Sequence, residues 1–445
     1  MRTLIKNATI VNEGEKFIGS IVINNGKIAE IIHEGEKPRK GEFQIVDAQG
    51  MYLIPGVIDD HVHFREPGLT HKGSIYSESR AAAAGGVTSY MDMPNTQPQT
   101  TDLKSLNQKY AIAAEDSAVN YSFYFGATDK NSNLFGRINP RKVCGIKLFM
   151  GSSTGNMLVD RRDKLAQIFA AAKLPIAVHC EDTTIINNNI KEVTAQEGSD
   201  PAVAFHPIIR STEACYQSTK SAIELAKEYG TQLHLLHIST AKELELLSAS
   251  TKRDKKIYAE VTPAHLTFSD GDYARLGTRI KCNPAIKTIK DRDALRRAVN
   301  ENKIDFIGTD HAPHHPDDKC GGALKAASGM PSIQFSLLAM LRLVDEGVFS
   351  IENLVEKMCH TPARIFNIRN RGFLRKGYIA DFVLIDPRTP HTIKKEDIIS
   401  KCGWSPFEGE TFNWSVRQTW VNGECVYKDG KINDEVRGKA LRFDR

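Results

Sequence analysis

Short apolar runs alternate with segments of helical periodicity through most of the chain. Eight runs of mainly apolar residues fit buried parallel strands, and each is separated from the next by a stretch that suits a helix. This alternation is typical of an α/β protein with a (β/α)8 barrel. The predicted strands are Val57–His63, Val87–Met91, Asn120–Phe125, Gly145–Met150, Pro175–His179, Leu233–His237, Ile257–Val261 and Phe306–Asp310.

The polar and apolar positions between these runs predict the helices. The longest interval, residues 181–232, must hold two of them, and three more follow the eighth strand. In that last group Leu337, Leu338, Leu341 and Val344 recur at helical spacing, which indicates packing against the barrel. The predicted helices are Tyr76–Ala84, Leu103–Ala114, Asp163–Ala172, Thr212–Tyr229, Ala241–Ser248, Pro331–Glu346, Ile351–Met358 and Thr361–Phe366.

The two chain ends show a different pattern of short alternating strands joined by tight turns. Asn25-Gly26 and Asn422-Gly423 each stand between two apolar runs, which is a strong signal for a β-hairpin. We therefore expect both ends to form one small β-sandwich domain beside the barrel. The predicted boundaries are 1–52 and 370–445 for the two parts of this domain and 53–369 for the barrel.

Composition narrows the class of protein. The chain has 445 residues, of which 41% are hydrophobic and 25% charged, as in ordinary globular proteins. The net charge of +5 is spread along the chain without a basic stripe, so we expect a small-molecule substrate and no nucleic-acid partner. We expect neither a signal peptide nor a membrane span, because the sequence has no apolar run of the length that either requires. The eight cysteines include no Cys-x-x-Cys pair, which suggests a reducing, cytoplasmic location. A homodimer is compatible with the sequence.

Polar residues stand at the ends of the predicted strands. His61 and His63 are two apart, so both imidazoles point to one face of the first strand. The active sites of such barrels lie at the carboxyl ends of the strands, where these side chains meet. Single strand-end histidines are often core residues, but several on one rim favour a shared site. The other strand-end residues are Lys147, His179, His237 and Asp310.

Imidazole and carboxylate donors together favour zinc or a neighbouring divalent ion. Five such ligands exceed the needs of one tetrahedral ion with an open position, so the pattern predicts two ions. An ammonium cannot bind a cation, whereas a Lys147 carboxylated by carbon dioxide could bridge the two ions. The alternative for Lys147 is an ordinary buried ion pair. The alternative for Arg65 is a surface ion pair with Glu66.

The chain resembles the amidohydrolase superfamily, and within it the dihydroorotases. The motifs that carry the resemblance are HVHFREPG at 61–68, MPNTQP at 93–98, GIKLFMG at 145–151, VHCED at 178–182, LHIST at 236–240 and GTDHAPH at 308–314. The resemblance extends from the first β segments to Tyr378–Asp381, which is nearly the whole chain.

This resemblance implies both a reaction and a set of site residues. The reaction is the reversible interconversion of dihydroorotate and N-carbamoyl-aspartate in de novo pyrimidine biosynthesis, with two Zn²⁺ ions. Asp310 would move the proton, and the unreactive carboxylate of the substrate would be held by a second group of side chains. The implied metal ligands are His61, His63, carboxylated Lys147, His179, His237 and Asp310, and the implied substrate ligands are His63, Arg65, Asn95, Asn283 and His314.

Two departures from the family pattern are visible. After the seventh strand the chain reads Thr262-Pro263-Ala264-His265, which lacks one imidazole of the usual pair, so we expect His265 to be structural. Asn283-Pro284-Ala285 replaces the usual Asn-Pro-Pro, and in some relatives an aspartate takes the place of the bridging lysine.

The loop 317–329, with Gly321, Gly322 and Gly329, is either a lid over the pocket or a plain connector.

Two other functions stay open from the sequence. A hydantoinase (dihydropyrimidinase) or an allantoinase would use the same metal ligands on a cyclic ureide without a carboxylate, and would have no need of Arg65 and Asn95. A non-catalytic partner of a transcarbamoylase would be expected to lose metal ligands, and this chain keeps all six.

Overall fold

A barrel of parallel strands forms the centre of the molecule. The computed structural model describes residues 2–151, 157–249 and 255–445, and all that follows refers to these residues. Hydrogen bonds join the strands in the order β6-β7-β8 and β9 through β14. A bridge between Val62 and His311 joins the last strand to the first. The strands are β6 (Val57–Val62), β7 (Val87–Asp92), β8 (Asn120–Phe123), β9 (Phe125–Gly126), β10 (Ile146–Met150), β11 (Ile176–Cys180), β12 (Leu233–Leu235), β13 (Ile257–Val261) and β14 (Phe306–Ile307).

The eight predicted strand positions are confirmed, with β8 and β9 sharing the third. Tyr124 separates these two short strands, but its amide still donates to Asp92 O of β7 at 3.1 Å, so the pairing continues across the break. Every pairing within the barrel is parallel, as the alternation with helices requires. The fold class predicted from the sequence is therefore correct.

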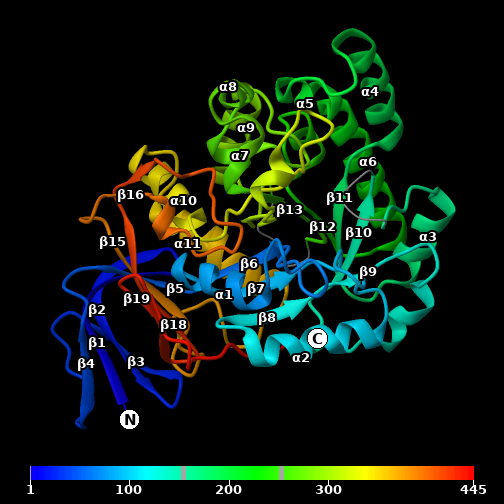
Figure 1. The fold of residues 1–445 in the computed structure, drawn as a ribbon. Coiled ribbons are helices and arrows are strands. Elements are labelled where there is room, and N and C mark those ends of the chain that lie inside the picture. Colours follow the sequence, from blue (N-terminus) through cyan, green and yellow to red (C-terminus); the bar gives the residue numbers. More distant parts are fainter. Residues whose placement is uncertain (1, 152–156, 250–254) are drawn as a thin grey trace.

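Helices cover the outside of the barrel (Figure 1). Their starts follow from side chains that accept hydrogen bonds from the first free amides, such as Ser74 before α1 and Asp102 before α2. Two long helices, α4 and α6, fill the interval predicted to hold two. The main helices are α1 (Ile75–Ala84), α2 (Leu103–Asp116), α3 (Arg162–Ala171), α4 (Thr183–Glu197), α6 (Thr212–Tyr229), α9 (Ile289–Asn300) and α10 (Ser336–Asp345), and shorter ones are α5 (His206–Ile209), α7 (Pro263–Thr267), α8 (Tyr273–Leu276), α11 (Ile351–Val355) and α12 (Thr361–Ile365).

The predicted helix Ala241–Ser248 is wrong. Only a single 3₁₀ turn, η3 (Glu243–Leu246), forms there. The buried carboxylate of Glu243 accepts hydrogen bonds from the amides of Ser239 and Thr240 and from the hydroxyl of Thr219. Thr240 and Glu243 thus form the reciprocal hydrogen bonds of a capping box, which starts the turn, and the turn ends at Leu246 without becoming an α-helix.

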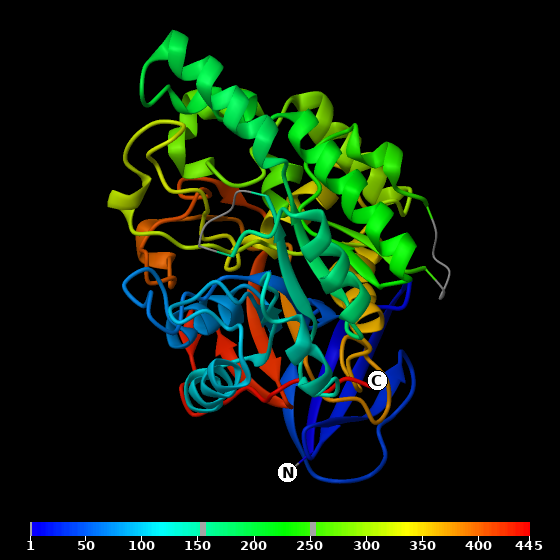
Figure 2. The same ribbon diagram turned by 90° about the vertical axis from the view of Figure 1, so that its right-hand side faces the viewer.

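Strands from both chain ends share one nine-stranded sheet. Its order is β20-β19-β18-β15-β5-β1-β2-β3, with β4 paired to β1, and in Figure 2 the blue and red strands of the two ends lie together in the lower half. The strands are β1 (Arg2–Asn12), β2 (Glu15–Asn24), β3 (Lys27–His33), β4 (Phe43–Asp47), β5 (Tyr52–Pro55), β15 (Phe382–Asp386), β18 (Ser415–Val421), β19 (Glu424–Lys428) and β20 (Lys431–Ile432), and a separate pair is formed by β16 (His391–Thr392) and β17 (Thr411–Phe412).

Both predicted Asn-Gly turns connect hairpins of this sheet. Asn25 and Gly26 have φ values of 49° and 73°, and Asn422 and Gly423 have 55° and 83°. Positive φ at both central residues is the geometry that favours Asn-Gly in tight hairpins. The two turns also pack on each other, because a Cβ added to Gly423 would lie 2.5 Å from the Cα of Gly26.

The β domain and the barrel share a hydrophobic core. Val383 and Ile385 of β15 belong to the same buried cluster as the barrel strands, whereas their neighbours Phe382 and Leu384 face the opposite side of the sheet. The domain boundaries at residues 52 and 369 therefore stay a prediction.

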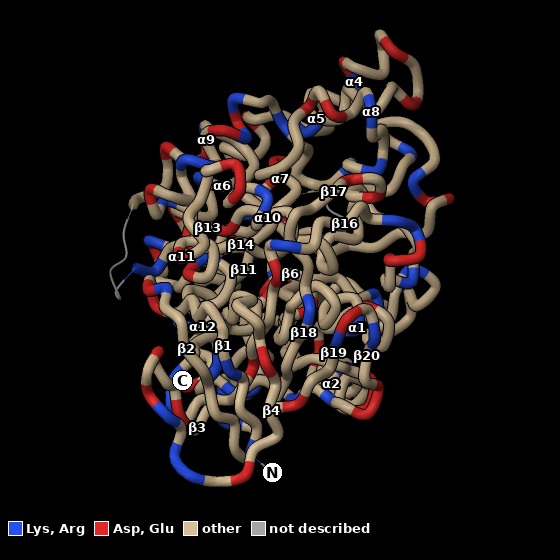
Figure 3. The backbone as a smooth tube through the Cα atoms, turned by 90° about the vertical axis from the view of Figure 1, so that its left-hand side faces the viewer, with Lys and Arg blue, Asp and Glu red and all other residues tan. Residues whose placement is uncertain are grey.

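In the described residues, no helix combines the length and the apolar character that a membrane crossing needs. Figure 3 shows lysine and arginine interspersed with aspartate and glutamate along the backbone.

Candidate active site

A small pocket opens at the carboxyl ends of the barrel strands. All the site residues predicted from the sequence line it except His314. The strands aim these side chains inward, since residues i and i+2 share one face. The lining residues are His61, His63, Arg65, Asn95, Lys147, Phe149, His179, His237, Asn283, Asp310, Ala312, Ser328 and Gly329.

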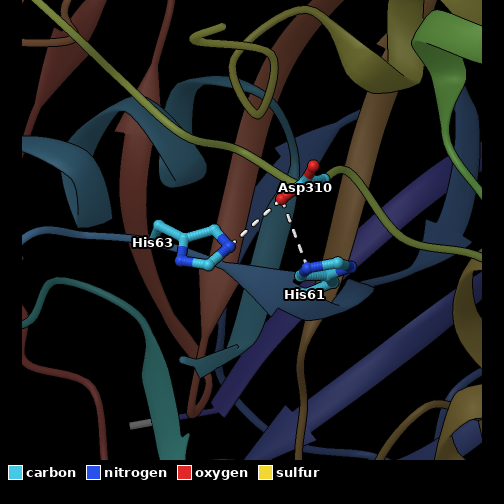
Figure 4. Close-up of side chains that lie close together, drawn as sticks. All are labelled: His61, His63 and Asp310. Carbon is cyan, nitrogen blue, oxygen red and sulfur yellow. Dashed lines mark ion pairs between the residues drawn. The ribbon is translucent and has the colours of Figure 1, made fainter. Parts of the chain in front are cut away.

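His61, His63 and Asp310 converge on one point of the pocket (Figure 4). The Nε2 atoms of His61 and His63 lie 3.2 and 3.1 Å from the same oxygen, Oδ1 of Asp310. The ligand atoms of the three residues all lie within 4.8 Å of one another. Two imidazole nitrogens and a carboxylate oxygen in this arrangement fit a zinc-like ion.

A second pair of donors lies beside the first. Nδ1 of His179 and Nε2 of His237 face each other at 2.9 Å. The rings of His61 and His237 are 5.3 Å apart between centroids, so the two pairs share one pocket wall. The pocket therefore gathers four imidazoles and a carboxylate, which are donors that can hold a metal.

The imidazoles of this site are neutral, as metal ligands must be. Burial lowers the pKa values of His61 and His237 well below the ordinary value for histidine. Burial raises the pKa of the Asp310 carboxyl. The neighbouring His61 and His63 lower that pKa by a larger amount, so the net shift is downward. Asp310 is therefore ionised at neutral pH.

Lys147 lies on β10 at the floor of the pocket with a relative exposure of 1%. Burial lowers the pKa of its ammonium to about 8. A fraction of the side chain is therefore an unprotonated amine at neutral pH, which is the form that reacts with carbon dioxide. The ring of Phe149 lies beneath its nitrogen, 4.6 Å away at the centroid.

Two buried carboxylates behind the pocket orient the imidazoles. Oε1 of Glu260 accepts hydrogen bonds from Nδ1 of His61 at 2.9 Å and from the amide of His237 at 3.0 Å. Glu181 pairs with His179 at 3.0 Å and with Arg210. Such partners fix the ring orientation and leave the opposite nitrogen for a metal. Neither residue was predicted from the sequence, although a glutamate in the apolar run Ile257–Val261 was a signal for Glu260.

Asn95 has a role that the sequence did not predict. Its Oδ1 accepts a hydrogen bond from Nδ1 of His63 at 2.8 Å, so it orients a candidate metal ligand as well as lining the pocket. Asn283 also lines the pocket, and its buried Oδ1 has no hydrogen-bond partner among the described residues. Both amides remain candidates for contact with a substrate.

Arg65 is buried at the edge of the pocket, where burial lowers the pKa of its guanidinium to about 10. It is therefore still charged at neutral pH. Its Nε donates to Pro313 O at 3.0 Å, and Nη2 lies 3.0 Å from Nε2 of His314. No ion pair to Arg65 is formed by a carboxylate of the described residues, so the alternative of a surface pair with Glu66 is wrong. A buried guanidinium without a carboxylate partner suits an anionic ligand.

His314 lies behind Arg65 rather than on the pocket wall. Its Nδ1 accepts from Lys72 at 3.1 Å, and Nε2 lies 3.1 Å from Ser328 O. Burial and the neighbouring cations Arg65 and Lys72 lower the pKa of His314, which keeps its ring neutral. Direct contact between His314 and a substrate stays a prediction.

His265 lies outside the pocket lining, as expected for a structural residue. Its Nδ1 bonds Thr262 Oγ1 at 2.8 Å and its Nε2 bonds Pro284 O at 3.1 Å. The ring thereby ties the start of α7 to the segment that carries Asn283.

The loop 317–329 is anchored rather than free. Nζ of the buried Lys319 donates to the carbonyls of Lys281, Ala327 and Gly329 at 3.1, 2.6 and 2.8 Å. Asp200 accepts from three amides of the loop, among them that of Gly322 at 2.8 Å. These bonds tie the loop to the barrel, and the loop brings Ser328 and Gly329 to the pocket wall.

Comparison with known proteins agrees with this geometry. The model of the amidohydrolase family matches residues 52–426. A dihydroorotase from Methanosphaera stadtmanae is 34% identical over 93% of this chain and 94% of its own, and an allantoinase from Desulfitobacterium hafniense is 32% identical over 99% and 98%. The solved L-hydantoinase (dihydropyrimidinase) of Arthrobacter aurescens superimposes with a TM-score of 0.91 at 28% identity, covering 97% of both chains.

The chain belongs to the amidohydrolase family, and is a hydrolytic enzyme with a barrel and a β-sandwich domain. This family is metal-dependent, and the convergent histidines and aspartate are the groups that can hold the metal. The non-catalytic alternative has no support. The relatives carry different substrate names, so the family alone does not select the substrate.

Proposed function

We propose that this enzyme interconverts dihydroorotate and N-carbamoyl-aspartate. The observation that carries the proposal is the buried guanidinium of Arg65, which lines the pocket and has no carboxylate partner in the described part of the chain. A buried charge of this kind needs a counter-ion to offset its desolvation. Dihydroorotate and carbamoyl-aspartate carry an unreactive carboxylate that meets this need.

The side chains of the pocket have separate tasks. Arg65 binds the substrate carboxylate with charge-assisted hydrogen bonds, and the amides of Asn95 and Asn283 add donors that fix the orientation of the ring. Asp310, ionised beside His61 and His63, accepts a proton at its carboxylate when the ring opens and returns it to the departing ring nitrogen. In ring closure it removes the proton of the ureido nitrogen instead.

Two Zn²⁺ ions with a carboxylated Lys147 complete the proposal. His61, His63 and Asp310 would hold one ion, His179 and His237 the other, and the carbamate on Lys147 would join them. When bound, the ions lower the pKa of water and stabilise negative charge at the attacked carbonyl. The lowered pKa of Lys147 supports the carbamate, because only the neutral amine adds carbon dioxide.

A reducing, cytoplasmic setting in pyrimidine biosynthesis is consistent with the cysteines. All eight cysteine side chains are free, and most of them are buried. Hydantoin, dihydrouracil and allantoin are the competing substrates, since proteins named for them are similar in sequence or structure. None of these carries a carboxylate, and each would leave the charge of Arg65 without a partner.

The test is a comparison of kcat/KM on one zinc-loaded sample. We expect dihydroorotate to be hydrolysed at least about 100-fold more efficiently than allantoin, hydantoin or dihydrouracil, since one buried charge pair discriminates by about 3 kcal/mol. Carbamoyl-aspartate should be cyclised by the same sample, and more strongly at acidic pH. Turnover of allantoin or hydantoin with none of dihydroorotate would overturn the proposal.

A further inference from the structure

A second group of polar side chains lies inside the barrel, away from the pocket lining. Asp60 on β6, His234 on β12 and Glu260 on β13 have relative exposures of 0%, 1% and 0%. Their ligand atoms all lie within 4.8 Å of one another. Two carboxylates and an imidazole therefore face one another in a place that bulk water does not reach.

Most of the polar atoms in this group have no hydrogen-bond partner among the described residues. This is true of both carboxylate oxygens of Asp60, both ring nitrogens of His234 and Oε2 of Glu260. A buried polar atom without a partner destabilises the folded state, because it has given up its hydrogen bonds to water. Native interiors satisfy such atoms with protein groups, water or an ion, so five of them on three adjoining residues indicate a ligand.

The spacing of these atoms distinguishes an ion from direct hydrogen bonds. Nε2 of His234 is 3.6 Å from Oδ2 of Asp60 and 3.8 Å from Oε2 of Glu260. These distances are too long for hydrogen bonds, which end at about 3.2 Å. Ligand atoms placed tetrahedrally at about 2.0–2.1 Å from zinc are about 3.4 Å apart, so small side-chain shifts would bring them into coordination.

The charge of the two carboxylates has to be neutralised in a place that bulk water does not reach. The ion-pair partners of the two carboxylates among the described residues are the imidazoles of His61 and His234, without a lysine or an arginine. Two carboxylates buried side by side repel each other unless a cation or protons neutralise them. Gly308 keeps the wall clear, because a Cβ there would lie 2.8 Å from Asp60 Oδ1 and from Glu260 Oε2.

We propose that Asp60, His234 and Glu260 form an additional site for a divalent ion of the zinc class, beneath the catalytic pocket. One nitrogen and two carboxylate oxygens are donors that zinc accepts. Glu260 connects this site to the pocket, since its other oxygen, Oε1, holds His61 and the amide of His237. An ion bound at Oε2 thus fixes the carboxylate that orients a catalytic imidazole. The proposal does not depend on which cyclic amide the enzyme hydrolyses.

Diffraction from crystals of the zinc-loaded wild-type enzyme, recorded on both sides of the zinc absorption edge, tests this directly. We expect an anomalous peak between Asp60, His234 and Glu260 that disappears below the edge. Elemental analysis of the same sample should give about three zinc ions per chain rather than the two of a binuclear pocket. Ordinary water density or an empty space between the three side chains, with about two ions per chain, would overturn the proposal.

The variant His234→Leu separates the new site from the pocket. His234 packs against Phe306 and Phe366, with ring centroids 4.4 and 5.6 Å away, so an apolar side chain suits the space. We expect it to lose about one zinc ion per chain and the inner anomalous peak, while the pocket peaks remain.

The matched control is His360→Leu, another buried imidazole, whose Nδ1 bonds Gly372 O and which lies outside the pocket lining. It should keep the wild-type zinc content. An unchanged zinc content in His234→Leu would contradict the proposal, and the wild-type diffraction data decide the question if that variant does not fold.

Discussion

Three residues of the pocket hold their side chains in place by unusual backbone geometry. Arg65, His237 and Asp310 have φ values of 69°, 40° and 49°, in the left-handed region that non-glycine residues rarely adopt. Each such residue costs about 1–3 kcal/mol, which the surrounding contacts must offset. All three follow the end of a barrel strand, where this turn of the backbone directs the side chain into the pocket. The strained backbone lowers the stability of the folded chain, but it orients these three side chains toward the pocket.

Replacing Arg65 with methionine should weaken substrate binding without removing the metals. The variant keeps the length of the side chain but loses the charge-assisted hydrogen bonds, worth about 1.5–3 kcal/mol. We expect KM for dihydroorotate to rise roughly 10- to 100-fold, as measured by steady-state kinetics, with metal content unchanged. Arg65→Lys keeps the positive charge but loses the two-pronged hydrogen bonding of the guanidinium, so its KM should lie between those of the wild type and Arg65→Met. An unchanged KM in Arg65→Met would remove Arg65 from the substrate site.

Replacing Lys147 with alanine should remove the bridge and with it the paired metal ions. We expect metal content and activity to fall together, because the alanine offers no ligand, and a short carboxylic acid such as propionate should restore part of both. Lys147→Met is the matched control, since its side chain fills the space that the acid would enter and should not respond to it. Full activity of Lys147→Ala in the absence of acid would show that another group forms the bridge.

Secondary-structure elements were predictable where the sequence pattern is periodic. The apolar runs located all eight barrel strands because each strand is buried on both faces and reads as a continuous run. The residues at the strand ends then predicted the pocket lining, because the carboxyl ends of parallel strands lie on the same rim of the barrel. The prediction of a helix over Ala241–Ser248 was wrong, because periodicity does not reveal that Glu243 is buried and held by a hydrogen bond from the distant Thr219.

The layer of residues behind the pocket could not be predicted in the same way. Glu260 acts through a hydrogen bond to His61, which lies on a strand far apart in the sequence, and Glu181 acts through its close pairing with His179. Only Glu260 has a local signal, because it stands in the apolar run Ile257–Val261, and nothing in the composition around Glu181 separates it from other glutamates. The position of His314 behind Arg65 likewise depends on Lys72, which comes from a different loop.

The loop 317–329 gives a prediction about pH. Burial lowers the pKa of Lys319 to about 7, well below the ordinary value for lysine. Between about pH 7 and about pH 10.4 the Lys319 amine therefore binds fewer protons in the folded chain than in the unfolded chain. The contribution of Lys319 to the free energy of unfolding rises with pH across that window. Lys319→Met should thus destabilise the enzyme more at pH 9 than at pH 6.5, by up to about 1.4 kcal/mol per pH unit.

The measurement is urea unfolding of the wild type and Lys319→Met at both pH values, with Lys325→Met, an exposed lysine of the same loop, as control. A cost of Lys319→Met that is equal at the two pH values, or larger at pH 6.5, would contradict the assigned protonation. The loss of bonds to Ala327 and Gly329 should also raise KM, since Gly329 is part of the pocket wall.

At the scale of the whole molecule, distant parts of the chain hold the barrel together. Strands β1 and β15 lie in one sheet through β5, and the residues near 440 run along β8, where Leu441 donates to Tyr121 O at 2.8 Å. Arg445 donates to the carbonyls of Cys144 and Phe366 at 2.9 and 3.0 Å. The floor of the barrel is therefore covered by the last residues of the chain.

Leu441 and Phe443 should accordingly contribute a large share of the folding free energy. Both side chains have a relative exposure of 0% and belong to the cluster that contains Phe306 and Phe366 of the barrel. Truncation of such residues to alanine costs about 2–5 kcal/mol each, against a total stability of about 5–15 kcal/mol. The double variant Leu441→Ala/Phe443→Ala should therefore unfold at a clearly lower urea concentration than the wild type. Arg442→Ala, an exposed neighbour, should shift the midpoint little, and a double variant as stable as this control would show that the segment does not dock under the barrel.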